Sequence, residues 1–125
     1  QLSRGLGDVY KRQVSLLSKS INKNSIISRY FTPYSCHETH AVTGTCCVAS
    51  SCLIPDTVGF RLLDKKESLN FNSEIIKIEH PMGFIDCIIV LNSNFKNNLV
   101  SKKDLVKSCG IYRTSRILMK GQVYL

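Results

Sequence analysis

The residues best suited to chemistry lie in one short stretch, residues 37–55. Thr43, Gly44 and Thr45 open a run that carries no charged side chain as far as Ile54. A helix with Thr43 as its N-cap would point its first free amides, of about residues 44–46, and the positive end of its dipole outward. Gly44 has no Cβ to hold a ligand away. These features predict a carboxylate site at Thr43, Gly44 and Thr45, and the alternative is a helix start satisfied by its own cap and by water.

Histidine and cysteine side chains flank this run. His37 is a candidate hydrogen-bond donor to a substrate, whereas we expect a structural role for His40. Neither histidine has a partner at metal-ligand spacing and Cys36 does not complete a zinc set, so no metal site is predicted. Cys46 and Cys47 fall in the first helical turn, where the dipole can lower a thiol pKa. We favour packing as their role, with a reactive thiolate as the alternative.

The elements that would position these residues are predicted from periodicity. The run from Thr43 to Ile54 lacks a polar stripe, so we expect a helix buried on nearly all sides and ended by Pro55. Upstream, Val14–Phe31 shows mixed helical spacings, which predict an amphipathic helix with a weak point at Asn22–Asn24.

The rest of the chain is typical of strands. A hairpin is predicted from two apolar runs that flank the turn signal His80–Gly83. Thr114–Met119 is expected to form a helical turn with Arg113 and Arg116 on one side, bound to carboxylates or carbonyls. The predicted fold class is α+β, a sheet wrapped round a central apolar helix. The expected strands are Val58–Leu63, Glu74–Glu79, Phe84–Leu91 and Leu105–Tyr112, with loops at Asp64–Ser73 and Asn92–Asn98.

Length and composition bound the class of protein. The chain has 125 residues, enough for one domain, and 43% hydrophobic residues, too many for a disordered chain. No apolar run is long enough for a membrane span. With no signal segment at its start, we interpret its six cysteines as reduced and expect a cytoplasmic protein. The net charge of +8 is spread without a block of like charges, so neither a nucleic acid nor a membrane is expected as partner.

The first residues are set aside. Ser3–Gln13 resembles an in-frame translation of the transposase adapter used to prepare sequencing libraries, whose end would encode Asp8–Gln13. We therefore expect residues 1–13 to be adapter-derived and disordered, without a packed role, which leaves a charge of +6 on the remainder. On this interpretation the natural start is missing, and 14–125 is the partial carboxy-terminal domain of a longer protein.

Three blocks carry a resemblance to a known family. His37–Pro55, His80–Gly83 and Tyr112–Tyr124 resemble, in order and spacing, the carboxy-terminal half of PrpF-type isomerases. This family includes 2-methylaconitate cis–trans isomerase and 4-oxalomesaconate tautomerase. The resemblance covers about residues 24–125. It implies a diaminopimelate-epimerase-like fold of two α+β domains, whose helix N-termini face a carboxylated substrate between them.

Some positions depart from the family pattern. Ala41 stands where diaminopimelate epimerases carry a catalytic cysteine, as is usual in PrpF-type enzymes, which argues against a two-thiol racemase. Asp56 replaces a glycine, Met82 a serine, Glu38 a basic residue and His40 an aromatic residue. These differences put the substrate in question more than the fold.

The resemblance implies a cofactor-independent isomerase or tautomerase acting by proton transfer on an aconitate-like or oxalomesaconate-like acid. This part would supply the substrate-binding residues His37, Thr43, Gly44 and Thr45 and no catalytic residue, since the family's Lys and Cys lie in the amino-terminal domain. Alone, it would be inactive. Its expected partners are a polycarboxylate substrate and that domain, and a homodimer is left open. The alternatives are another isomerase of this fold, phenazine-biosynthesis-like or an epimerase, or a non-enzymatic anion-binding domain.

Overall fold

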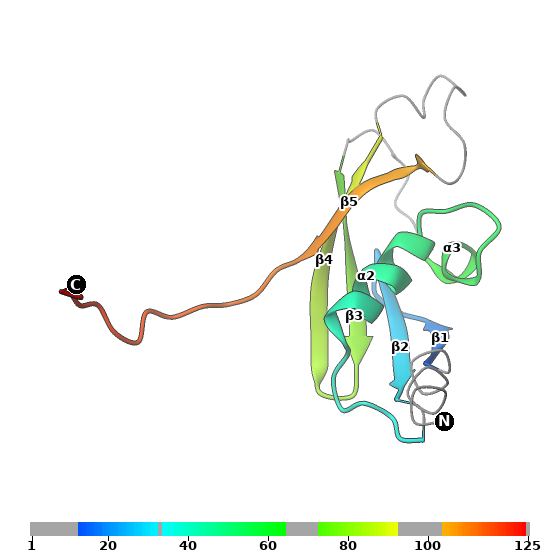
Figure 1. Ribbon diagram of the computed structural model, residues 1–125. Helices are drawn as coiled ribbons and strands as arrows, with labels where there is room; N and C mark the ends of the chain where they lie inside the picture. The colour runs from blue at the N-terminus through cyan, green and yellow to red at the C-terminus, as the bar shows by residue number, and fades with distance from the viewer. Residues whose placement is uncertain (1–12, 33, 65–72, 93–103, 125) are drawn as a thin grey trace, which may run out of the picture.

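The described residues form a five-stranded mixed sheet with two helices (Figure 1). The structure is a computed structural model that describes residues 13–32, 34–64, 73–92 and 104–124. The strands lie side by side in sequence order, and all neighbours are antiparallel except β2 and β3. This arrangement is α+β, as predicted. The strands are β1 (Val14–Lys19), β2 (Ser25–Phe31), β3 (Ser73–His80), β4 (Gly83–Leu91) and β5 (Val106–Ile111), and the helices are α2 (Val42–Ser51) and α3 (Val58–Leu62).

The first two strands replace the predicted amphipathic helix, which is wrong. β1 and β2 pair antiparallel from Val14 opposite Phe31 to Lys19 opposite Ile26. In β2 every second side chain is buried, so the apolar period is that of a strand. Asn24, assigned to a weak point of a helix, instead ends the hairpin turn with a positive φ of 55°, a conformation that asparagine tolerates.

The predicted hairpin of β3 and β4 is confirmed. Its register runs from Ser73 opposite Val90 to His80 opposite Gly83. Gly83 has a φ of 138°, which a residue with a side chain rarely adopts, so this turn depends on glycine. The predicted strand at Leu105–Tyr112 is also confirmed, as β5 along the other edge of β4.

The two helices connect β2 to its parallel neighbour β3. The predicted strand at Val58–Leu63 is wrong, because Thr57 caps a short helix there by accepting a hydrogen bond from the Phe60 amide at 3.2 Å. Asp56 precedes it with a positive φ of 71°, which explains the glycine that the family pattern has at this position. Gly59 lets α3 approach α2 closely, since a Cβ there would lie 2.5 Å from the Ser51 hydroxyl.

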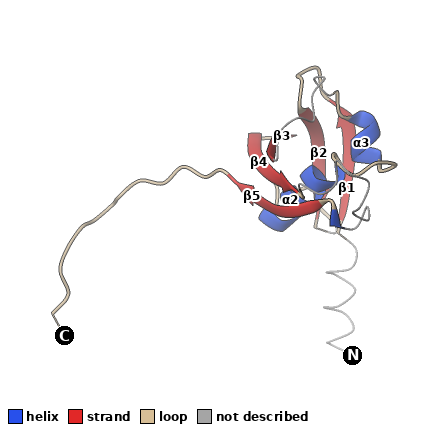
Figure 2. Cartoon of the chain, turned by 90° about the horizontal axis from the view of Figure 1, so that it is seen from above, coloured by secondary structure: helices blue, strands red, loops and turns tan. Residues whose placement is uncertain are grey.

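The core lies between α2 and one face of the sheet (Figures 1 and 2). α2 contacts β3, β4 and β5, and its buried residues are Thr45, Val48 and Ala49. Its other side, with Thr43 and Cys47, is exposed, so the prediction of a helix buried on nearly all sides is wrong for this structure. A single sheet can cover only one side of a helix. The core residues are Ile26, Val48, Ala49, Cys52, Leu53, Leu63, Ile76, Ile78, Cys87 and Ile89.

The chain after β5 leaves the domain. Residues 112–124 are exposed, form no helix or strand, and extend away from the sheet (Figures 1 and 2). The helical turn predicted at Thr114–Met119 is therefore wrong, because its apolar side chains are exposed and do not pack against the described part of the domain. Over the part of the chain that the structure describes, neither helix is long and apolar enough to cross a membrane. The predicted loops at 64–73 and 92–98 fall almost wholly outside the described residues, as do residues 1–12 of the adapter-like segment.

Candidate functional site

The site is built on the first turn of α2. The helix begins at Val42. Its N-cap residue, Ala41, has an extended backbone and makes no side-chain capping hydrogen bond. The prediction of Thr43 as N-cap is therefore wrong by two residues. The Thr45 amide donates to the Ala41 carbonyl at 2.8 Å, so the amides before it, of Val42, Thr43 and Gly44, precede the first helical hydrogen bond. No acidic side chain lies in this turn, so the turn itself supplies no counter-charge to the positive end of the dipole.

A hollow of about 400 Å³ opens beside this turn, and we call it the α2 hollow. Thr43 and Gly44 contribute to it from the helix, while Tyr30 and Ser15 come from the paired strands β2 and β1. The Tyr30 hydroxyl donates to Oε1 of Gln13 at 2.5 Å, so Gln13, placed above in the adapter-like segment, does contact the domain. The complete lining is Gln13, Ser15, Tyr30, Thr43, Gly44, Cys47 and Val48.

Gly44 is needed here for packing. A Cβ at this position would lie 2.7 Å from Cε2 of Tyr30 and 3.3 Å from Cε1 of His40. The missing side chain therefore lets the Tyr30 ring lie against the helix. Sequence reasoning attributed this glycine to the close approach of a ligand, and the structure supplies a second reason that local sequence does not contain.

Thr45 and His40 form a buried polar network. The Thr45 hydroxyl lies 3.0 Å from Nδ1 of His40 and donates to the Ala41 carbonyl at 2.9 Å. On the other side of the ring, Nε2 lies 2.9 Å from the Ser28 hydroxyl, which lies 2.5 Å from that of Ser15. Because the Thr45 hydroxyl donates to a carbonyl, the pattern assigns the proton to Nδ1 and has Ser28 donate to Nε2. The side chain and amide of Thr45 are thus both engaged inside the protein.

The surroundings of His40 disfavour its charged form. Burial is the largest cause that lowers its pKa, and the neighbouring His80 and His37 lower it further against a raising effect of the Ala41 carbonyl. Its ring packs on that of Tyr30 with centroids 4.8 Å apart. The structure supports the structural role expected for His40.

His37 lies outside the α2 hollow. Its amide donates to the Tyr30 carbonyl at 2.7 Å, and its Nδ1 accepts from the Thr39 amide at 3.1 Å. The half-buried ring is therefore oriented by its own loop. Of the four predicted substrate-binding residues, the structure brings Thr43 and Gly44 to one hollow, places Thr45 beneath them, and leaves His37 apart.

The two cysteines of the first turn have different surroundings. Cys47 is exposed at the α2 hollow, whereas Cys46 is half-buried toward the sheet. Burial and the neighbouring thiol of Cys109 raise the pKa of Cys46, which is opposite to the lowering that the helix dipole predicts. Cys46 meets Cys87 and Cys109 there, a cluster from distant parts of the sequence that sequence reasoning missed.

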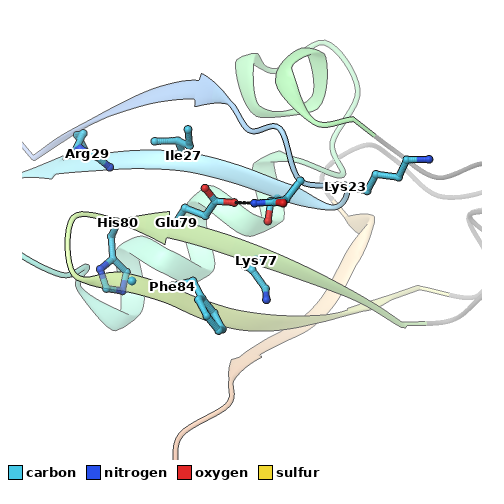
Figure 3. A pocket seen from close by; sticks show the side chains of 10 residues that line it. Lys23, Ile27, Arg29, Lys77, Glu79, His80 and Phe84 are labelled. Atoms are coloured by element: carbon cyan, nitrogen blue, oxygen red, sulfur yellow. Dashed lines mark hydrogen bonds between the residues drawn. The ribbon is translucent and has the colours of Figure 1, made fainter.

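A second hollow, of about 500 Å³, lies against β2, β3 and β4 and includes Arg29, Lys77 and His80 (Figure 3). Lys77 lies 3.8 Å from an oxygen of Asp86 and 3.8 Å above the Phe84 ring. Within it, Glu79 accepts hydrogen bonds from Ser20 and Asn22 at 2.7 and 3.0 Å, which lower its pKa. We call this the outer hollow. Its positive charges are partly balanced by these carboxylates.

The two arginines predicted to bind carboxylates or carbonyls, Arg113 and Arg116, line neither the α2 hollow nor the outer hollow. Arg116 is exposed in the extended tail, and Arg113 is exposed beside Tyr112 at a shallow depression over β4. His80, assigned from the sequence to the turn, is the last residue of β3 and accepts a hydrogen bond from the Met82 amide at 3.3 Å.

Comparison with known proteins identifies relatives over nearly the whole chain. The putative isomerase YbhH of Escherichia coli (strain K12) is 32% identical over 124 residues, 97% of this chain and 32% of that protein. The 4-oxalomesaconate tautomerase of Pseudomonas putida is 31% identical over 121 residues, 94% of this chain and 30% of that enzyme. The 3-methylitaconate isomerase of Eubacterium barkeri is 27% identical over 100 residues, 80% of this chain and 23% of that enzyme.

The chain therefore spans about a third of the length of the first two of these relatives. The family described as PrpF protein matches residues 8–125, a range that contains all three blocks singled out in the sequence and every described strand and helix. The relatives are named as isomerases and tautomerases. Because the family matches nearly the whole sequence, this chain belongs to the PrpF family.

Proposed function

We propose that this chain is the substrate-binding part of an isomerase or tautomerase that shifts a double bond in an unsaturated polycarboxylic acid by proton transfer. The observation that carries the proposal is the start of α2, where the amides of Val42, Thr43 and Gly44 open beside a hollow with no acidic side chain in the turn. A carboxylate there would accept hydrogen bonds from these amides and be stabilised by the helix dipole.

The names of the relatives support the substrate class. Oxalomesaconate and methylitaconate are both unsaturated acids with more than one carboxylate, and both names belong to relatives that align with this chain. In such reactions negative charge develops on a carboxylate next to the carbon that loses a proton. Amide donors fixed by a helix would stabilise that charge without reorganising, which is how a binding site also lowers a barrier.

We further propose the diaminopimelate-epimerase-like architecture for the whole protein. On this proposal, the exposed side of α2 faces a second, amino-terminal domain that supplies the general acid and base, and no metal or organic cofactor takes part. Among the four substrate-binding candidates, Thr43 and Gly44 would contact the carboxylate, Thr45 would hold the turn, and His37 would act from the neighbouring loop. A cytoplasmic location and a homodimer stay predictions.

The test is a titration of the isotope-labelled chain with cis-aconitate, followed by amide chemical shifts. We expect saturable shifts at Val42, Thr43 and Gly44. Thr43→Glu should weaken binding at least tenfold, because its carboxylate competes for the same amides, while the helix itself is stabilised by an acidic residue in its first turn. Thr114→Glu, the same substitution at an exposed threonine of the tail, is the matched control and should bind normally.

Two results would overturn the proposal. One is the absence of saturable shifts at these three amides, and the other is equal affinity in the two glutamate variants. The chain alone should not turn over oxalomesaconate or methylaconitate, because the acid and base are assigned to another part of the protein. Measurable turnover would refute that assignment.

The outer hollow favours one other candidate, a non-enzymatic anion-binding role. Arg29, Lys77 and His80 line it, and Lys77 lies over the exposed ring of Phe84. Figure 3 shows Lys23 pointing away from them. If this were the functional surface, cis-aconitate would shift the amides of β3 and β4 instead of α2, and Lys77→Gln would weaken binding while Thr43→Glu would not.

A further inference from the structure

Three thiols converge under α2, at the side opposite the His40 network. Cys46 comes from the helix, Cys87 from β4 and Cys109 from β5, and their sulfur atoms all lie within 4.8 Å of one another. Sγ of Cys87 and Sγ of Cys109 are 3.2 Å apart. All three cysteines are free, and the cluster is distinct from the α2 hollow, which contains Cys47 instead.

Strand register explains how the cluster forms. Ile111 lies opposite Cys87, and Cys109 lies opposite Ile89, so the two cysteines are diagonal neighbours on the face of the sheet that α2 covers. Cys46 closes the group from above, where its carbonyl accepts a weak hydrogen bond from the Cys109 thiol at 3.7 Å. The three positions are therefore set by regular secondary structure, which holds ligands more precisely than a loop does.

The chemistry of the donors indicates what they could bind. Thiols are poor hydrogen-bond partners, yet as thiolates they are preferred ligands of zinc and other soft metal ions. Zinc–sulfur bonds of about 2.3 Å in a tetrahedral site place neighbouring sulfur atoms about 3.8 Å apart. The observed separations, from 3.2 Å to no more than 4.8 Å, bracket that value, so small side-chain rotations would bring all three sulfurs to bonding distance.

We propose that Cys46, Cys87 and Cys109 form a binding site for a divalent d10 metal ion of the zinc group. Binding breaks three S–H bonds, forms three metal–sulfur bonds and releases three protons to solvent, with no change of oxidation state. Cys46 and Cys109 are half-buried, which leaves room for water as the fourth ligand. The ion would tie the helix to β4 and β5. This departs from the sequence-based prediction of no metal site, which considered only Cys36 and the histidines.

The experiment is a titration of the reduced, metal-free chain with Cd²⁺, which reports thiolate binding through its charge-transfer absorption, followed by displacement with Zn²⁺. We expect saturation at one equivalent and release of about three protons per ion, as the coordination of three thiols requires. Cys46→Ser and Cys109→Ser should each weaken binding at least tenfold. Cys47→Ser is the matched control, because Cys47 neighbours Cys46 but is exposed away from the cluster, and it should bind as the unchanged chain does.

Melting temperature gives a second readout. One equivalent of Zn²⁺ should raise the melting temperature of the unchanged chain and of Cys47→Ser, but not that of Cys109→Ser. The proposal is overturned if Cys46→Ser binds Cd²⁺ as tightly as the unchanged chain does, or if Cys47→Ser weakens binding as much as Cys46→Ser. It is also overturned if Cys87 and Cys109 form a disulfide under the reducing conditions of the titration.

Discussion

The two flanks of α2 differ in how completely their polar atoms are satisfied. Toward β2, the Thr45 hydroxyl and both ring nitrogens of His40 have partners within 3.2 Å, and Gly44 lies against Tyr30. Toward β4 and β5, the partners of the three thiols among the described residues are one another and the Cys46 carbonyl, which accepts a weak hydrogen bond at 3.7 Å. A saturated network of oxygen and nitrogen holds the helix in place, whereas an unsaturated group of sulfur atoms has capacity left for a ligand.

At the start of α2, the residues that hold the helix in place differ from the amides that we propose bind an anion. The His40 network fixes the direction in which the amides of Val42, Thr43 and Gly44 point, although none of its buried side chains needs to touch a substrate. Such a supporting layer is what an anion site requires, because a loosely held helix end would lose its preorganisation.

Removing the His40 ring should lower the free energy of unfolding the most. His40→Ala deletes a buried side chain that packs on Tyr30 and leaves the hydroxyls of Ser28 and Thr45 without their nitrogen partner. We expect the free energy of unfolding to fall by about 3 kcal/mol, measured by urea denaturation. His37→Ala, in the same loop but half-buried, should cost less than about 1 kcal/mol. Equal losses would mean that the network does not anchor the helix.

Adding one methyl group at Gly44 should lower the free energy of unfolding by a somewhat smaller amount. Gly44→Ala places a Cβ 2.7 Å from the Tyr30 ring, so either the ring or the helix must shift. We expect a loss of about 2 kcal/mol, within the usual cost of overpacking. Gly121→Ala is the control, since nothing lies within 4 Å of a Cβ there. A neutral Gly44→Ala would show that ligand approach, and not packing, is the reason for this glycine.

Lowering the pH should destabilise the side of α2 that holds the His40 network. The pKa of His40 is lowered by burial from its ordinary value of 6.5, so the unfolded chain binds a proton more readily than the folded chain. The free energy of unfolding should therefore decrease as the pH falls below about 6.5, and be fully restored above it. The pKa of His80 is lowered as well, chiefly by burial, and His80 contributes in the same direction.

Denaturation at pH 7 and pH 5 checks this expectation in the unchanged chain, in His40→Gln and in His80→Asn. The loss of stability on acidification should shrink most in His40→Gln. An unchanged loss in that variant would show that another group titrates in this range.

In the absence of metal, a substitution in the cluster of Cys46, Cys87 and Cys109 should lower the stability least. Cys109→Ala removes a half-buried sulfur whose hydrogen bonds are weak, so we expect a loss of about 1 kcal/mol. Thermal denaturation in the presence of a chelator measures it. A loss as large as that of His40→Ala would contradict the contrast between the two flanks.

Local sequence determined the parts of this fold whose signals are short-range. The hairpin of β3 and β4 follows from alternating apolar residues on both sides of His80–Gly83, and glycine is required at the end of that turn. The charge-free run after Ala41 does form a helix. The three family-like blocks of the sequence predicted the PrpF family, to which the chain belongs. Each of these inferences needs only neighbouring residues.

Tertiary contacts decided the rest. Val14–Phe31 carries apolar residues that suit a helix or a strand, and pairing between β1 and β2 selects the strand. The role of Gly44 depends on Tyr30, which lies in another element, and the meeting of Cys46 with Cys109 joins positions 63 residues apart. Sequence spacing cannot predict such neighbours, because strand register and helix docking set them, and both are properties of the folded chain.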